Sequence, residues 1–110
     1  MDSWDEIYAG IRAQFVAHSV DRLDDVERSL DGLEANPDDA NHLAAVRVHF
    51  HKLSGSGGTY GFPAITSLCL SGELRCRLLL DTGGVPAPED VADWREILAS
   101  IRAELAAAAN

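Results

Sequence analysis

The sequence predicts an all-α protein that folds as an up-and-down helical bundle. Apolar residues recur at the three-to-four spacing of helices, and no segment needs the alternation of a strand. The chain has 110 residues, of which 46% are apolar, enough for one domain with a single core. Helix-breaking residues gather in three short stretches, at 35–39, 61–63 and 81–90, so the connections are short. We therefore expect residues 1–110 to form a single domain.

The first third of the chain is expected to hold a short helix followed by a long one. Ser3 and Glu6 have the spacing of a capping box, which starts a helix. One apolar face follows, formed by Trp4, Ile7, Tyr8, Ile11 and Phe15. A second apolar series is out of phase with it and contains Val20, Leu23, Val26, Leu30 and Leu33. This phase change predicts a bend or break near residues 17–20, and hence a short additional N-terminal helix before the bundle.

Three further helices are expected, each starting beside a proline. The first starts around 37–39, the second at Pro63, and the third after Pro88, where Glu89 and Asp90 suit a first helical turn. The second carries Ile65, Leu68, Cys69, Cys76, Leu79 and Leu80, and the third Val91, Trp94, Ile97, Leu98, Ile101 and Leu105. Seven residues of helix rise about 10.5 Å, too far for a disulfide. Cys69 and Cys76 are therefore expected to be buried, reduced thiols.

The charge of the chain excludes several classes of partner. A net charge of −9 and a pI near 4.6 argue against nucleic acid and against anionic membranes, which attract basic surfaces. No apolar run approaches the roughly 20 residues that span a bilayer, and the N-terminus is acidic where a signal peptide is basic. These observations indicate a cytoplasmic protein without nucleic-acid or membrane partners.

The stretch from His51 to Phe62, HKLSGSGGTYGF, is the most informative part of the sequence. On a helix, the apolar positions of this region form a core stripe that continues through the glycines to about Tyr60. His51 lies more than about 100° from the centre of that stripe, on the solvent side. Gly55 and Gly58 would remove side chains next to the exposed imidazole, and Gly57 would let another helix pack closely. The alternative is a flexible linker, with His51 at the helix end.

Charge marks the same region. Of the 18 acidic residues, 11 lie at or before Asp39 and seven at or after Glu73, which leaves residues 40–72 without any. Arg47 and Lys52 lie in this interval, so an anion such as a phosphoryl group would not be repelled there. The alternative is that a packed helix has less exposed surface to charge.

These residues resemble a known family. His51-x-Leu53-x-Gly55-Ser56, then Tyr60-Gly61-Phe62, and Glu73 22 residues after the histidine resemble the histidine phosphotransfer (HPt) domains of bacterial multistep phosphorelays. The "TYGF" ending also resembles the phosphotransfer domain of chemotaxis kinases. The resemblance implies an antiparallel four-helix bundle in which His51 exchanges a phosphoryl group with aspartates of receiver domains. The complete expectation is an antiparallel up-and-down four-helix bundle with a short additional N-terminal helix.

The chemistry implied is that of a phosphoryl carrier. A neutral imidazole is a competent nucleophile near pH 7, and residues 40–72 offer no carboxylate for a metal beside His51. We therefore expect that the protein is not an enzyme by itself and binds no cofactor. The Mg²⁺ needed for transfer would be bound by the partner receiver domain. The expected partners are response-regulator receiver domains and a hybrid histidine kinase, acting on a monomer. The expected phosphoryl and docking positions, which surround His51, are Arg47, Lys52, Ser54, Gly55, Gly58, Ala44 and Val48.

Two other functions are consistent with the pattern. A helical adaptor could bind receiver domains without being phosphorylated, although such a protein would not need His51. A metal-binding bundle could use His42 and His49, but these lie two turns apart and lack further ligands in their segment. We expect both to pack at the edge of the core or to make a boundary hydrogen bond.

Overall fold

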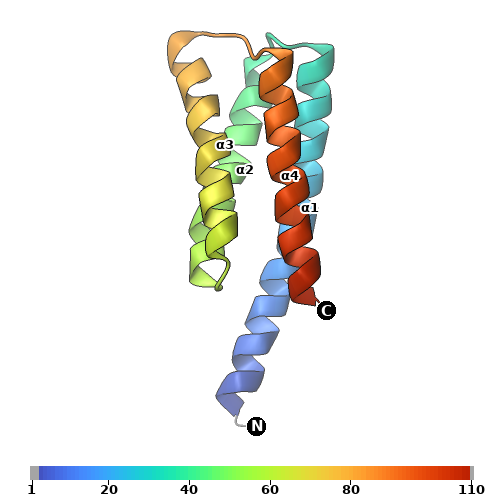
Figure 1. Ribbon diagram of the computed structural model, residues 1–110, viewed down its shortest axis with the longest axis vertical. Coiled ribbons are helices and arrows are strands. Elements are labelled where there is room, and N and C mark those ends of the chain that lie inside the picture. Colours follow the sequence, from blue (N-terminus) through green and yellow to red (C-terminus); the bar gives the residue numbers. More distant parts are fainter. Residues whose placement is uncertain (1–2, 110) are drawn as a thin grey trace.

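The computed structural model describes residues 3–109 and contains four helices in those residues. They are α1 (Ser3–Ala35), α2 (Ala40–Thr59), α3 (Pro63–Thr82) and α4 (Pro88–Ala109). Successive helices run in opposite directions, and α1 packs against both α2 and α4 while α3 completes the bundle (Figure 1). The predicted four-helix bundle is therefore confirmed. None of these helices is long and apolar enough to cross a membrane.

The expected additional N-terminal helix is wrong, because α1 is one uninterrupted helix of 33 residues. The apparent break in phase has a simple cause. Ser19 is only 2% exposed and fills the inward position between Phe15 and Leu23, whereas Val20 is 47% exposed and points outward. The buried series of α1 thus continues through 15, 19 and 23 at helical spacing. A polar residue in a core position hid that continuity.

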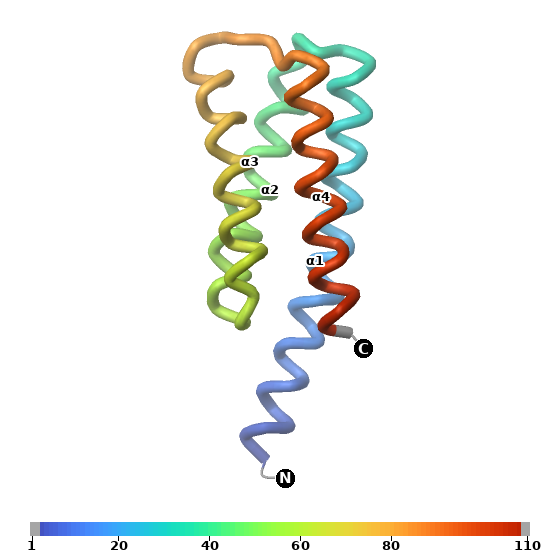
Figure 2. Tube along the Cα trace, in the orientation of Figure 1, coloured from blue at the N-terminus to red at the C-terminus, as the bar shows by residue number. Residues whose placement is uncertain are grey.

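The first turns of α1 extend beyond the end of the bundle. The tube in Figure 2 shows this segment running past the turn between α2 and α3, which gives the molecule its length of 52 Å against widths of 21 and 18 Å. Of the apolar face expected here, only Phe15 is buried, and Trp4, Ile7, Tyr8 and Ile11 are exposed. This face therefore does not form part of the protein's own core.

Helix α2 begins at a side-chain cap and passes through the glycines. The Asp39 carboxylate accepts a hydrogen bond from the Asn41 backbone N–H at 2.9 Å, which caps the helix. The helix continues to Thr59, where the Tyr60 N–H still bonds to the Ser56 carbonyl. The prediction that the helix persists is confirmed, and the flexible-linker alternative is wrong. Gly61 then takes a positive φ of 83° to turn the chain into Pro63 and α3.

Small residues allow α2 and α3 to approach closely. A Cβ on Gly57 would lie 3.1 Å from Thr66 Oγ1 and 3.3 Å from Ile65 Cγ2, both on α3. Cys69 and Cys76 are buried and unbridged in the adjoining core, as predicted. Burial, with a smaller contribution from the charge of Glu73, raises the pKa of each thiol to about 12. Both thiols therefore stay protonated and unreactive at neutral pH.

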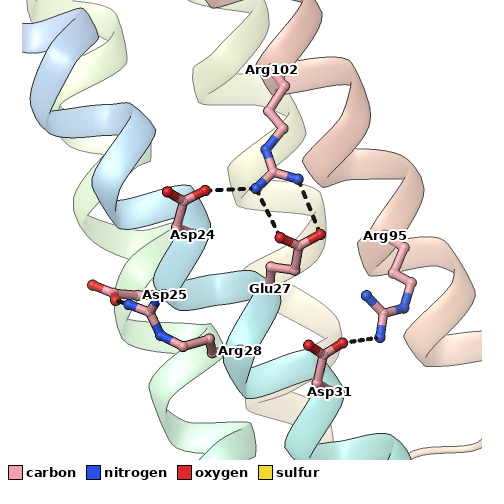
Figure 3. Close-up of polar contacts among 7 residues, drawn as sticks. All are labelled: Asp24, Asp25, Glu27, Arg28, Asp31, Arg95 and Arg102. Atoms are coloured by element: carbon pink, nitrogen blue, oxygen red, sulfur yellow. Dashed lines mark hydrogen bonds and ion pairs between the residues drawn. The ribbon is translucent and has the colours of Figure 1, made fainter.

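Ion pairs align α1 with α4 (Figure 3). Arg102 of α4 binds Asp24 and Glu27, and Arg95 binds Asp31 and Glu34. Pairs this exposed each contribute at most about 1 kcal/mol. Because four carboxylates of α1 are bound to arginines of α4, these ion pairs orient the two helices relative to each other. Within α1, Arg28 also pairs with Asp25.

The start of α4 is held by a carboxylate that is mostly buried. Asp90 accepts hydrogen bonds from Arg75 Nε at 2.8 Å and Nη2 at 3.2 Å, and from the Ala87 backbone N–H at 2.8 Å. The last of these bonds satisfies a backbone donor at the helix start, as in a capping box. The Arg75 hydrogen bond, with help from the Ala87 N–H and the Arg75 charge, holds the pKa of Asp90 below its ordinary value.

Asp90→Asn is expected to lower the free energy of unfolding at pH 7 by about 1 kcal/mol, the typical value of a cap. A carboxyl with a lowered pKa stabilises the fold above its unfolded pKa of about 3.9 and loses that contribution as pH falls further. The gap between wild type and variant should therefore close below about pH 4. Urea unfolding at pH 7 and pH 3 measures it, with the exposed Asp93→Asn as control. A gap that stays constant would contradict this reading.

Candidate functional site

The site is centred on His51, which stands on the outer face of α2. Its side chain is 67% exposed, and its Nδ1 lies 3.0 Å and 3.2 Å from the two carboxylate oxygens of Glu73. Glu73 comes from α3, and its side chain is only 5% exposed. The accessible His51 ring is thus held in place by the buried carboxylate of Glu73 on the neighbouring helix α3.

This contact determines which ring nitrogen can react. A carboxylate accepts hydrogen bonds and does not donate them, so Nδ1 of His51 carries the proton. In the neutral ring the lone pair then lies on Nε2. With Nδ1 held by Glu73, Nε2 is left as the nucleophilic atom of the accessible imidazole.

Arg47 supplies a counter-charge to the same carboxylate. Its Nη1 lies 3.5 Å from Glu73 Oε1, and its side chain is partly exposed one turn before His51. A buried carboxylate needs such partners, because an unpaired buried charge is costly. Arg47 therefore acts on the site through Glu73 in this structure.

Bare backbone surrounds the imidazole on its C-terminal side. A Cβ on Gly55 would meet nothing within 4 Å, and one on Gly58 would meet only Thr66 Oγ1, at 3.4 Å. On the N-terminal side, Ala44 is half-buried and Val48 is exposed. Another protein can therefore approach the ring with little steric hindrance.

An open hollow lies beside His51, between α1 and α2. It extends from His51 and Gly55 to Tyr60, and both Lys52 and Arg22 line it. Among the described residues 3–109, no acidic side chain lines this hollow. In a chain with a net charge of −9 this is a local cationic surface next to the candidate nucleophile.

Ser54 is the one expected docking residue that the structure places elsewhere. It is buried, its hydroxyl donates to the His51 carbonyl at 2.7 Å, and its own carbonyl accepts from Thr66 Oγ1 at 2.8 Å. The Ser54 side chain is therefore turned into the α2–α3 interface and is not available to a docking protein. Its hydroxyl supports the helix backbone beneath the site.

The other histidines of α2 have structural partners. His49 is half-buried, and its Nδ1 lies 3.1 Å from Arg22 Nη1. Burial, together with the nearby charges of Arg22 and Lys52, lowers the pKa of His49, so its neutral ring accepts this bond. His42 packs over Gly32 of α1 and lies 3.6 Å from Asp39. The expected packing and boundary roles are confirmed, and the described part of the chain holds no cluster of three metal-ligating side chains.

Two residues of the site were not among the expected positions. Glu73 was visible in the motif through its spacing from His51, but its contact with Nδ1 depends on the packing of α3 against α2. Arg22 is 29 residues before His51 on another helix, and the sequence alone contains no signal for it.

Comparison with known proteins bears on the family and the fold of this chain. The Hpt domain family matches residues 10–110, almost the whole chain. The solved structure of the CheA phosphotransferase domain from Thermotoga maritima has the same fold, with a TM-score of 0.88 and 20% identity. The alignment covers 93% of this chain and 97% of that one. No curated protein matches the sequence significantly.

Fold and site together define a helical phosphotransfer module, with an accessible histidine on a four-helix bundle. The chain belongs to the Hpt domain family. Domains of this family carry phosphoryl groups on a histidine and act with receiver domains and kinases in phosphorelays. The resemblance read from the His51 motif is therefore confirmed at the level of the family.

Proposed function

We propose that His51 is the phosphoacceptor, and that this chain relays a phosphoryl group between receiver-domain aspartates through Nε2 of His51. The observation that carries the proposal is the pair of His51 and Glu73, since it leaves Nε2 as the free nitrogen on an open surface. Of the four histidines in the chain, His51 combines this exposure with a buried carboxylate partner.

The reaction is an exchange of one bond to phosphorus for another. The Nε2 lone pair attacks the phosphorus of an aspartyl phosphate, and the Nε2–P bond forms. The P–O bond to the aspartyl carboxylate breaks, and that carboxylate leaves with its electron pair. The ring becomes positively charged, with Nδ1–H still directed at Glu73, which stabilises this charge. Transfer onward is the same step in reverse.

The remaining catalytic parts are proposed to come from the partner. Phosphoryl transfer depends chiefly on positioning and on neutralising charge. We propose that the receiver supplies Mg²⁺ and its acidic residues, while Lys52 and Arg22 face the phosphoryl oxygens. On this view the protein is a carrier and not an enzyme by itself. It would act as a cytoplasmic monomer between a hybrid histidine kinase and response-regulator receivers.

A labelling experiment tests the assignment. The purified protein is incubated with a panel of the host's phosphorylated receivers, and acid-labile, base-stable phosphate is measured on it. We expect wild type and His49→Gln to be labelled and His51→Gln to carry no label, because glutamine offers no nucleophilic nitrogen. His49→Gln is the matched control, since it changes the same residue type two positions away.

Other outcomes would replace the proposal. Label that survives in His51→Gln and is lost in His49→Gln would move the site to His49. Receiver binding without any label on the wild-type protein would favour the adaptor function.

A further inference from the structure

A groove between α1 and α2 contains a buried hydroxyl that has no partner in the protein. Ser19 of α1 is only 2% exposed, and it lines this groove. Residues 3–109 offer its hydroxyl no hydrogen bond, although buried polar groups normally have one. No polar side-chain atom of these residues is both sealed from solvent and unpaired, so the Ser19 hydroxyl must open onto the groove. Its hydrogen-bond partner therefore has to come from the groove.

The walls of the groove suit a flat apolar body. Ile11 and Phe15 of α1 and Leu53 of α2 line it, and the Phe15 ring stacks on Tyr60 with 5.0 Å between the ring centroids. The volume of the groove is about 310 Å³, at the lower end of the roughly 300–1,000 Å³ of small-molecule pockets. A small ligand with an aromatic or other planar apolar part would cover these side chains.

The polar side chains of the groove favour an anion. Arg22 and Lys52 both line it, and His18 adds a ring that carries an N–H donor in either neutral tautomer. Arg22 is held in place from behind, because its Nη1 lies 3.1 Å from Nδ1 of His49. No acidic side chain of residues 3–109 lines the groove. Guanidinium and ammonium groups bind carboxylate, phosphate and sulfonate-type oxygens most strongly.

We propose that this groove is a binding site for a small organic anion with a flat apolar body. The anionic group lies between Arg22 and Lys52, the body covers Phe15, and a polar atom of the ligand bonds to the Ser19 hydroxyl. One consequence rests on the proposed function. Arg22 and Lys52 also line the hollow beside His51, so a bound anion occupies the charges that would face the phosphoryl oxygens. The ligand would therefore inhibit phosphoryl transfer.

The combination of walls and charges disfavours other small ligands. A cation would meet Arg22 and Lys52 without any carboxylate to offset them. A neutral apolar molecule would cover the walls but displace water from two charged groups without replacing its hydrogen bonds. Inorganic phosphate would pair with both charges but leave the apolar walls uncovered. An anion with an apolar body satisfies all three parts of the groove.

Two fluorescent dyes that differ only in charge test the site. Anilinonaphthalene sulfonate has an aromatic body and a sulfonate group, and phenylnaphthylamine is the same body without the sulfonate. Each dye is titrated into the full chain, and its Kd is obtained from fluorescence. We expect one sulfonate dye to bind per chain, about tenfold more tightly than the neutral dye, because only the sulfonate forms charge-assisted hydrogen bonds.

Variants then locate the bound dye. Lys52→Gln should raise the Kd of the sulfonate dye about tenfold and leave that of the neutral dye unchanged. Arg28→Gln is the matched control, because it removes one positive charge from an exposed side chain that does not line the groove. Ser19→Leu fills the groove from its floor and should abolish binding of both dyes. Ser56→Leu fills it from α2 and replaces that test if Ser19→Leu does not fold by circular dichroism.

Several results would overturn the site. Equal affinity of the wild-type protein for the two dyes would remove the charge recognition. Binding that is unchanged in Ser19→Leu and Ser56→Leu would place the dye elsewhere on the molecule.

A labelling experiment tests the inhibition separately. Saturating sulfonate dye should slow phosphoryl labelling of the wild-type protein at least tenfold and leave the groove-filled variant at its own rate without dye. If the dye binds but labelling is not slowed, the inhibitory role is wrong. If His51→Gln keeps its label, the proposed function fails, whereas the dye titrations involve no phosphoryl group and still decide whether the groove binds anions.

Discussion

Glu73→Gln is expected to slow phosphoryl transfer to His51 about tenfold, and Glu73→Ala about a hundredfold. Glutamine still accepts the Nδ1–H bond through its side-chain oxygen, so it keeps the ring oriented but removes the negative charge. Alanine removes both the charge and the orientation. Hydrogen bonds to charged groups are typically worth about 1.5–3 kcal/mol, which corresponds to this range of rates.

The measurement is single-turnover transfer from a phosphorylated receiver, with ¹⁵N NMR of the imidazole ring as a second readout. In wild type and in Glu73→Gln we expect the proton on Nδ1, and in Glu73→Ala a mixture of the two tautomers. Glu96→Gln, an exposed change on α4, is the matched control. Thermal unfolding of each variant separates lost chemistry from lost structure.

Equal transfer rates in all three proteins would show that Glu73 has only a structural role. A slow rate without any change of tautomer in Glu73→Ala would assign its effect to charge alone. Either result would mean that Glu73 does not select Nε2 as the nucleophile by orienting the His51 ring.

The sequence predicted the helices well where their ends have strong local signals. Pro63, Pro88 and the acidic residues around 37–39 are found at helix starts, because each satisfies the terminal backbone or its dipole locally. The predicted break in α1 was wrong because no local signal in the sequence shows that the helix continues there. Ser19 is buried by tertiary packing, and a pattern of apolar residues cannot register a serine in a core position.

The part of the surface around His51 that α2 itself forms could be predicted from the sequence. The positions of Gly55 and Gly58 follow from helical phase, and the structure leaves both open. Ser54 has a phase near the edge of the core, and the close packing of α3 decides that it is buried. The contributions of Glu73 and Arg22 come from other helices, so they depend on how the bundle packs.

Gly72→Val is expected to lower the free energy of unfolding by about 2–3 kcal/mol. Gly72 lies where α3 packs against both α2 and α4, and a Cβ there would lie 2.8 Å from Phe50 Cε2 and 3.3 Å from Ile97 Cδ1. Phe50 is fully buried, so its ring can move aside only by displacing its neighbours in the close-packed core. Valine gains only about 0.5 kcal/mol of helix propensity over glycine, so overpacking dominates.

Thermal and urea unfolding measure the effect, and we expect the melting temperature to fall by about 10 °C or more. Gly10→Val is the matched control, because a Cβ at Gly10 meets nothing within 4 Å. A double-mutant cycle with Phe50→Leu identifies the cause, since a smaller side chain at 50 makes room for the added Cβ. Gly72→Val should then cost about 1–2 kcal/mol less in the Phe50→Leu background than in wild type. If the two costs simply add, the Phe50 ring is not the obstacle, and the close approach of α2 and α3 beside Glu73 does not depend on a glycine at 72.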